Sequence, residues 1–144
     1  MAQPASAAPM PYGAPITLDL ARKILAAAEA EAIALGWPMV IAIVDTGSHL
    51  KLLQRMDNAQ IGSVQVAQRK AETAAGFRRS TKVFEEMLVA GGAGLKMLSV
   101  ADVCMLEGGL PIVKDGQIIG GIGVSGMASH QDAQVAVAGL AAIK

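Results

Sequence analysis

The stretch GGLPIVKDGQIIGGIGVSG, residues 108–126, places the strongest constraint on the fold. Two runs of β-forming residues, 110–114 and 117–124, flank Asp115-Gly116. An Asp-Gly pair between apolar runs is the strongest short signal of a β-hairpin. The second run also contains three glycines. Glycine weakens a strand, so such a strand often marks the close approach of a ligand or another backbone. The sequence therefore predicts an antiparallel hairpin with one nearly bare strand.

Helical and extended patterns alternate in the first half of the chain. Thr17 is a typical helix N-cap residue, apolar residues follow it at helical spacing, and Gly36 is a typical helix end. The run MVIAIV at 39–44 is rich in β-branched residues, which predicts a buried strand. The run LKLLQRM after the DTGSH turn completes a second hairpin.

Two helices are predicted between the hairpins. The first begins near Asn58 or Ile61 and ends at Phe77 or Arg78. Small residues, mostly alanine, recur along one of its faces, so another backbone can approach that face closely. Thr81 is expected to cap a short helix that follows.

The last helix is predicted to begin at Ser129 and to end at Lys144, because Ser129 with Asp132 three residues later resembles a capping box. Hairpins connect the strands, which favours an antiparallel sheet flanked by helices. The predicted fold class is α+β. We expect one domain over residues 17–144, preceded by a flexible N-terminal arm over residues 1–16 that is rich in proline and alanine.

The low charge content predicts a homo-oligomer. Charged residues make up 17% of the chain and hydrophobic residues 53%, whereas a typical domain has about 25% charged residues. Surplus apolar surface is commonly buried between subunits, although abundant alanine is the alternative explanation. The single cysteine, Cys104, lies in an apolar stretch and is expected to be a core residue.

Charge and hydropathy also limit the partners. Twelve basic and twelve acidic residues cancel, and aromatic residues make up 3% of the chain, so nucleic acid is not an expected partner. No apolar run reaches the roughly 18 residues that cross a bilayer, so no membrane partner is expected. The N-terminal residues do not resemble a signal peptide, which favours a cytoplasmic location.

Polar residues in the alanine-rich helix form the best candidate site. Lys70, Thr73 and Phe77 share one helix face, and Arg69 and Thr73 are spaced as neighbours on the helix surface. A guanidinium fork, an ammonium charge and a hydroxyl together suit a carboxylate ligand. The alternative is a solvated helix edge on which Arg69 and Glu72 form an exposed pair.

Other residues are weaker candidates. Asp57 and His49 are candidates to move a proton, together with Lys70, although turn or solvated roles are the alternative for the first two. Ser125 is a candidate hydrogen-bond donor to a ligand, with a structural turn as the alternative. Neither His49 nor His130 has a partner at metal-ligand spacing, so the sequence assigns no metal ligand.

The chain resembles the GlcG/HbpS family, which includes haem-degrading HbpS-like proteins and the C-terminal domain of PduO adenosyltransferases. The resemblance lies in PMVIAIVDTGSHL, RMDNAQIGSVQVAQRKAETAAGF, the glycine-rich hairpin and the closing Ser-Asp helix, which follow one another in order. It covers nearly everything after residue 16. It implies an α+β domain with profilin-like layering that assembles with itself.

The resemblance also implies a ligand. Some family members bind haem, so haem or a related tetrapyrrole is the expected ligand and no other cofactor is expected. Arg69 or Lys70 would pair with a propionate of that small anionic ligand. With the residues of the family pattern added, the predicted ligand-binding set is Met56, Arg69, Lys70, Thr73, Phe77, Gly109 and Ser125.

Two other functions remain open on the sequence. One is a lyase or hydrolase that acts on a small hydroxy or aromatic carboxylic acid, as in glycolate or aromatic catabolism. In such an enzyme Arg69 would hold the carboxylate while Asp57, Lys70 or His49 moves a proton. The other is an oligomeric scaffold without a ligand.

Overall fold

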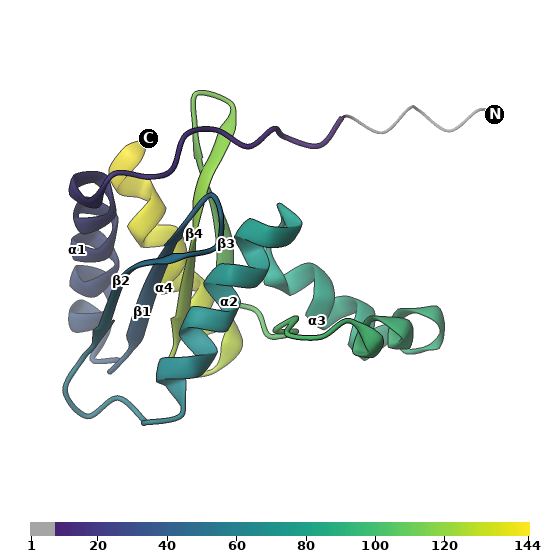
Figure 1. The fold of residues 1–144 in the computed structure, drawn as a ribbon. Coiled ribbons are helices and arrows are strands. Elements are labelled where there is room, and N and C mark those ends of the chain that lie inside the picture. Colours follow the sequence, from purple (N-terminus) through teal and green to yellow (C-terminus); the bar gives the residue numbers. More distant parts are fainter. Residues whose placement is uncertain (1–7) are drawn as a thin grey trace.

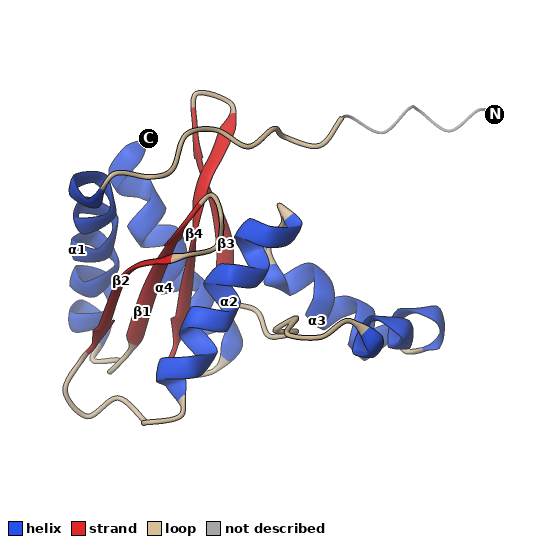
Figure 2. Ribbon diagram, viewed as in Figure 1, coloured by secondary structure: helices blue, strands red, loops and turns tan. Residues whose placement is uncertain are grey.

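A computed structural model of the chain describes residues 8–144. Its four strands form one antiparallel sheet in the order β2-β1-β4-β3. Helices α1 and α4 cover one face of this sheet and α2 covers the other (Figures 1 and 2). The arrangement confirms the predicted α+β class. The elements are α1 (Leu18–Leu35), β1 (Val40–Asp45), β2 (Leu50–Arg55), α2 (Ser63–Phe77), α3 (Thr81–Ala90), η1 (Gly92–Ser99), β3 (Gly109–Lys114), β4 (Gln117–Ser125), α4 (Ser129–Leu140) and η2 (Ala141–Ile143).

The predicted hairpin is β3 and β4, joined by Asp115 and Gly116. Both turn residues have a positive φ, 51° and 72°, as a two-residue turn of type I′ requires. Strand β4 lies between β1 and β3, and every residue from Ile118 to Ser125 is buried. The hairpin therefore supplies β4, one of the two inner strands of the sheet.

The glycines of β4 let α2 lie directly on the sheet. A Cβ atom at Gly123 would overlap the Ala67 carbonyl oxygen, and one at Gly121 would overlap the Ala71 carbonyl oxygen. Ala67, Ala71 and Ala75 are fully buried on the facing side of α2. The close neighbour predicted for this bare strand is thus the backbone of α2.

The first helix has the predicted ends, but the third has a different cap. Thr17 Oγ1 accepts a hydrogen bond from Leu20 N, and Gly36 ends α1 with a φ of 70°. Ser80, and not Thr81, caps α3, because the Ser80 hydroxyl accepts from a backbone N–H of the first turn. Thr81 is instead buried, and its hydroxyl accepts a hydrogen bond from Gly109 N at 2.8 Å.

The start of the last helix also differs from the prediction. Ser129 is the first helical residue and Ala128 precedes it as the N-cap. Gln131 Oε1 accepts a hydrogen bond from Ala128 N at 3.0 Å, so Gln131 performs the role predicted for Asp132. Asp132 is buried and forms an ion pair. The α-helix ends at Leu140, and a short 3₁₀ turn follows.

Residues 11–16, within the predicted arm, lie beside β4 where β1 ends. Gly13 N donates to the Ile118 carbonyl oxygen at 2.8 Å, and Ile16 N donates to the Ile119 carbonyl oxygen at 2.9 Å. Ile16 is 2% exposed and belongs to the core. Contacts with the domain therefore begin before residue 17, and the first seven residues of the arm lie outside the described part. Within that part, no helix is long and apolar enough to cross a membrane.

We expect Gly123→Ala to lower the free energy of unfolding by about 2–3 kcal/mol, because the added methyl group pushes α2 away from β4. The matched control is Gly62→Ala, since Gly62 has an ordinary helical φ and nothing within 4 Å of its hypothetical Cβ. Urea denaturation of both variants measures the difference. Equal stability of the two variants would contradict the close contact.

Candidate functional site

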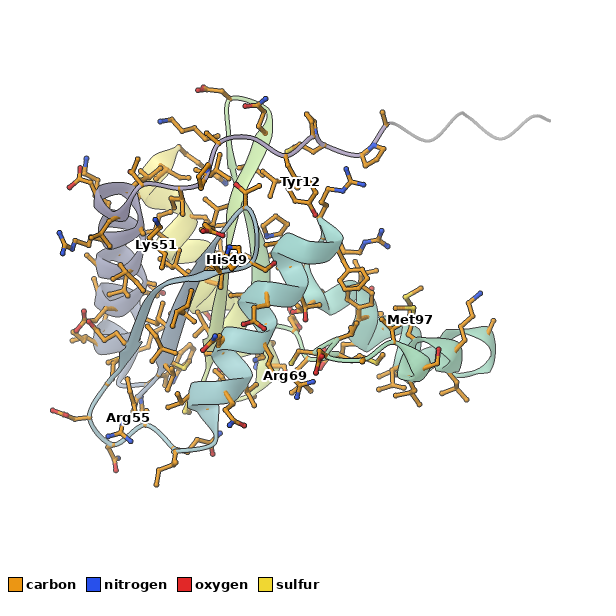
Figure 3. The ribbon with its side chains drawn as sticks, in the orientation of Figure 1. Tyr12, His49, Lys51, Arg55, Arg69 and Met97 are labelled. Atoms are coloured by element: carbon orange, nitrogen blue, oxygen red, sulfur yellow. The ribbon has the colours of Figure 1, made fainter. Side chains whose placement is uncertain are left out.

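Helix α2 divides the predicted cationic pair between two environments. Arg69 and Lys70 follow one another, so their side chains leave the helix about 100° apart. Arg69 is exposed on the outer side of α2 (Figure 3), whereas Lys70 is 1% exposed and points toward the sheet. The structure therefore does not bring these two cations together in one patch.

Lys70 forms a closed ion pair inside the domain. Its Nζ atom donates to Asp132 Oδ2 at 2.9 Å and to the Val124 carbonyl oxygen at 2.9 Å. The second carboxylate oxygen of Asp132 accepts a hydrogen bond from Met127 N at 2.9 Å. A Cβ atom at Gly108 would lie 2.8 Å from Nζ, so the absence of a side chain there leaves room for the ammonium group. In this geometry Lys70 joins α2 to the start of α4.

Burial dominates the electrostatics of this pair. Burial raises the pKa of the Asp132 carboxyl, and the charge and hydrogen bond of Lys70 only partly offset that rise. Removal of one partner of a buried ion pair destabilises a fold by far more than the intact pair stabilises it, because the remaining charge is left uncompensated. Among the described residues, no buried side-chain nitrogen or oxygen lacks a hydrogen-bond partner.

Arg69 borders a shallow hollow on the outer face of α2. The hollow has a volume of about 240 Å³ and is lined by Gln65, Gln68, Arg69 and Glu72. Gln68 Nε2 donates to Glu72 Oε1 at 3.0 Å. Within residues 8–144, the Arg69 guanidinium has neither an ion-pair partner nor a hydrogen-bond acceptor, so the alternative Arg69–Glu72 pair is not formed. A planar cationic fork is thus available to a ligand.

Thr73 and Phe77 stabilise the segment that follows α2. Thr73 is 3% exposed, and its Oγ1 atom accepts a hydrogen bond from Cys104 N at 3.0 Å. Phe77 packs edge to face against Phe84, with ring centroids 5.4 Å apart. Burial raises the pKa of the Cys104 thiol, and the charges of Lys70 and Arg69 lower it to a smaller extent. Cys104 is buried, as expected for a core residue.

Gly109 and Ser125 are also inside the domain. Gly109 N donates to the Thr81 hydroxyl. Ser125 is 5% exposed and donates its hydroxyl to Ser63 Oγ at 2.9 Å, and Ser63 in turn accepts from Gln60 Nε2 at 2.8 Å. Both predicted ligand contacts therefore have protein partners in this structure.

The three candidates for proton transfer lie in separate places. His49 stands at the start of β2 with its Nδ1 atom 3.4 Å from Asp45 Oδ1. Asp57 follows the other end of β2, and a six-residue strand spans about 20 Å. Figure 3 shows His49 and Arg55 at opposite ends of this strand. Lys70 is enclosed between α2 and the start of α4, where it pairs with Asp132. Within the described residues, these three side chains are therefore not placed to act together in catalysis.

Asp57 borders a second hollow, of about 380 Å³, near the end of β2. Its lining residues are Glu29, Ile33, Gln54, Arg55, Met56 and Asp57. This hollow contains two predicted site residues, Met56 and Asp57, but neither Arg69 nor Thr73. Within the described part of the chain, no cluster of three or more His, Cys, Asp or Glu side chains is placed to hold a metal ion.

Sequence reasoning missed the role of Asp132. Its position three residues after Ser129 gave it a local explanation as a capping residue. Its actual partner, Lys70, is 62 residues away in the chain, so no spacing rule connects them. The residues next to each of them gave no signal of burial, because Lys70 lies between Arg69 and Ala71 and Asp132 lies between Gln131 and Ala133.

Known proteins resemble this chain over most of its length. The family model described as "Haem degrading protein HbpS-like" matches residues 16–141. The protein GlcG of Escherichia coli K12 is 43% identical over 110 residues, which is 76% of this chain and 81% of GlcG. A solved complex of PduOC with haem superposes with a TM-score of 0.81 at 29% identity and covers 90% of this chain and 96% of that one. A double mutant of Streptomyces reticuli HbpS superposes with a TM-score of 0.84 at 28% identity and covers 100% and 99%.

We expect Lys70→Met to destabilise the fold by about 3–5 kcal/mol near neutral pH, because it leaves the Asp132 carboxylate buried without a counter-charge. Loss of Lys70 also raises the pKa of Asp132 further. A raised carboxyl pKa in the folded state stabilises that state at low pH, and this stabilisation is lost as pH rises through the folded value. The difference in the free energy of unfolding between Lys70→Met and the natural chain should therefore shrink as pH falls from neutral toward the ordinary pKa range of a carboxyl group.

Chemical denaturation at a series of pH values measures this effect. The double variant Lys70→Met/Asp132→Asn is the matched control, since Asn keeps an acceptor for Met127 N and carries no charge. It should be more stable than Lys70→Met at neutral pH and should lose the extra pH dependence. A loss of stability in Lys70→Met that does not change with pH would argue against the buried ion pair.

Proposed function

This chain belongs to the family of haem degrading HbpS-like proteins, and from that premise we propose that it is a self-assembling small-ligand-binding protein that takes haem or a related tetrapyrrole. The haem complex of its structural relative PduOC supports this class of ligand. Family membership shows the fold and the relatedness, whereas the ligand depends on the residues at the site.

The exposed and unpaired guanidinium of Arg69 carries the proposal. A tetrapyrrole such as haem bears propionate carboxylates on one edge of a flat apolar ring. Arg donates two parallel hydrogen bonds to a carboxylate, and such charge-assisted pairs are about twice as strong as neutral ones. Arg69 has no competing partner among the described residues, so this fork is free to hold a propionate.

The surroundings of Arg69 fit one edge of such a ligand. The hollow beside it, about 240 Å³, is smaller than the roughly 300–1,000 Å³ of typical ligand pockets. Gln65 and Gln68 line it beside Arg69, and their amide groups can donate hydrogen bonds to the polar edge of the ring. Haem, when bound, would supply iron chemistry, and Arg69 would hold one of its propionates.

The structure offers less support for the catabolic enzyme. A lyase or hydrolase needs a proton-transfer group within hydrogen-bond reach of the bound acid. Asp57 and His49 lie at opposite ends of β2, and Lys70 already donates to Asp132 and Val124. Binding therefore ranks above catalysis as the proposed function, and the roles of Asp57, His49 and Lys70 in proton transfer stay predictions.

Titration of the full chain with haem should produce a saturable shift of the Soret band. We expect Arg69→Ala to weaken binding by about tenfold, which corresponds to the loss of one charge-assisted hydrogen bond at a partly exposed site. Arg22→Ala is the matched control, because Arg22 is an exposed residue of α1 on the opposite side of the sheet. This control should bind haem like the natural chain.

A second ligand separates the carboxylate contact from ring binding. The dimethyl ester of the porphyrin lacks the propionate charges, so it should bind more weakly and respond little to Arg69→Ala. A spectrum unchanged by the addition of haem would refute the proposed ligand. Equal haem affinity of Arg69→Ala and the natural chain would refute the role of Arg69.

A further inference from the structure

A second hollow lies where β2 ends, and it shares no lining residue with the hollow beside Arg69. Its volume is about 380 Å³, within the roughly 300–1,000 Å³ of small-molecule pockets. Glu29 and Ile33 reach it from α1, and residues 54–57 line it from β2 and the turn that follows. Figure 3 shows Arg55 at the end of β2 that leads into this turn. The proposed haem contact does not depend on this hollow.

Backbone hydrogen bonds hold the β2 side of the hollow in place. Met56 N donates to the Met39 carbonyl oxygen at 3.0 Å, which continues the pairing of β1 with β2 by one residue. Ala59 N donates to the Met56 carbonyl oxygen at 3.1 Å and closes the turn. On the other side, Glu29 and Ile33 are four residues apart and therefore share one face of α1. The lining side chains are thus attached to a regular helix and to a hydrogen-bonded turn.

Three charged side chains border the hollow without an ion-pair partner. Among residues 8–144, the ion pairs include neither Glu29 nor Arg55 nor Asp57. The guanidinium can hold a carboxylate through two parallel hydrogen bonds, and each carboxylate can hold an ammonium group. The positive charge of Arg55 disfavours a bare metal cation at the same place. A complementary ligand therefore carries one negative and two positive groups.

Ile33 and Met56 add an apolar part to the lining. Ile33 is 62% exposed, and Met56 is half-buried against the core beneath α1. Methylene groups of a ligand would cover Ile33, and the flexible thioether side chain of Met56 can adapt to their shape. The Gln54 amide can accept from an ammonium group or donate to a carboxylate. The lining as a whole suits a short aliphatic chain with charged ends.

We propose that this hollow binds a free basic α-amino acid of the lysine type, which carries one carboxylate, two ammonium groups and a methylene chain. Arg55 holds the carboxylate, and Glu29 and Asp57 hold the two ammonium groups. Ile33 and Met56 contact the methylene chain. A neutral amino acid would leave one of the two carboxylates unpaired, and a diamine would leave Arg55 unpaired.

Titration of the isotope-labelled full chain with L-lysine, followed by amide NMR at low ionic strength, tests the site. Saturable shifts should be largest at residues 29–33 and 54–59. Three analogues each lack one recognised group: norleucine lacks the side-chain ammonium, Nα-acetyl-L-lysine the α-ammonium and cadaverine the carboxylate. The first two should bind about fivefold more weakly than L-lysine, as expected for the loss of one exposed ion pair. Cadaverine should bind about tenfold more weakly, because it loses a bidentate contact.

Variants of the lining residues separate recognition from a structural effect. Arg55→Gln should bind L-lysine about tenfold more weakly but should bind cadaverine at least as well as the natural chain, since cadaverine has no carboxylate for Arg55 to hold. Glu29→Gln and Asp57→Asn should each bind L-lysine about fivefold more weakly. Each should also remove the advantage of L-lysine over either norleucine or Nα-acetyl-L-lysine. Arg22→Gln is the matched control, because Arg22 is exposed on α1 and does not line the hollow.

Amide shifts that only rise linearly with the concentration of L-lysine would overturn the site. Equal affinities for L-lysine and cadaverine would also overturn it, as would an Arg22→Gln variant that weakens binding as much as Arg55→Gln, because either result indicates general charge attraction. Equal binding of Nα-acetyl-L-lysine would assign the hollow to the C-terminal lysine of a peptide and refute the free amino acid as its ligand.

Discussion

The backbone contact between α2 and β4 determines where the functional side chains lie. Glycines at 121 and 123 remove the Cβ atoms that would separate the two elements, and alanines supply the facing side of α2. At this short distance a lysine on the inner face reaches the end of β4 and the start of α4. Lys70 consequently bonds to Val124 and Asp132, while the next residue back, Arg69, is directed outward.

This geometry gives two adjacent cations different tasks. Lys70 is enclosed with a carboxylate whose pKa is raised by burial, so its contribution is to the position of α4 relative to α2. Arg69 is exposed and unpaired within the described chain, so it is available to an anion. The comparisons confirm the resemblance to the GlcG/HbpS family, but they leave the roles of individual residues to be argued from contacts. On those contacts, only the outward cation suits a propionate.

The hollow at Arg69 is small, about 240 Å³, and side chains of α2 line it. Large apolar side chains are exposed elsewhere, on α3 and η1, and include Val89 and Leu98. Low charge content over the whole sequence is consistent with burial of apolar surface between subunits, since such surfaces are depleted in charged residues.

Local sequence signals determined the elements of this protein, and tertiary packing decided the roles of its polar residues. The Asp115-Gly116 turn, the strand at 39–44 and the Thr17 cap depend on residues close together in the chain, so pattern and spacing were sufficient to predict them. Ser80 was missed as a cap because the hydroxyls at 80 and 81 are locally equivalent, and only the position of Gly109 distinguishes them. Whether Lys70 faces solvent or Asp132 is likewise undecided by helix periodicity, because its partner is 62 residues away and meets it only when α2 lies on the glycine strand.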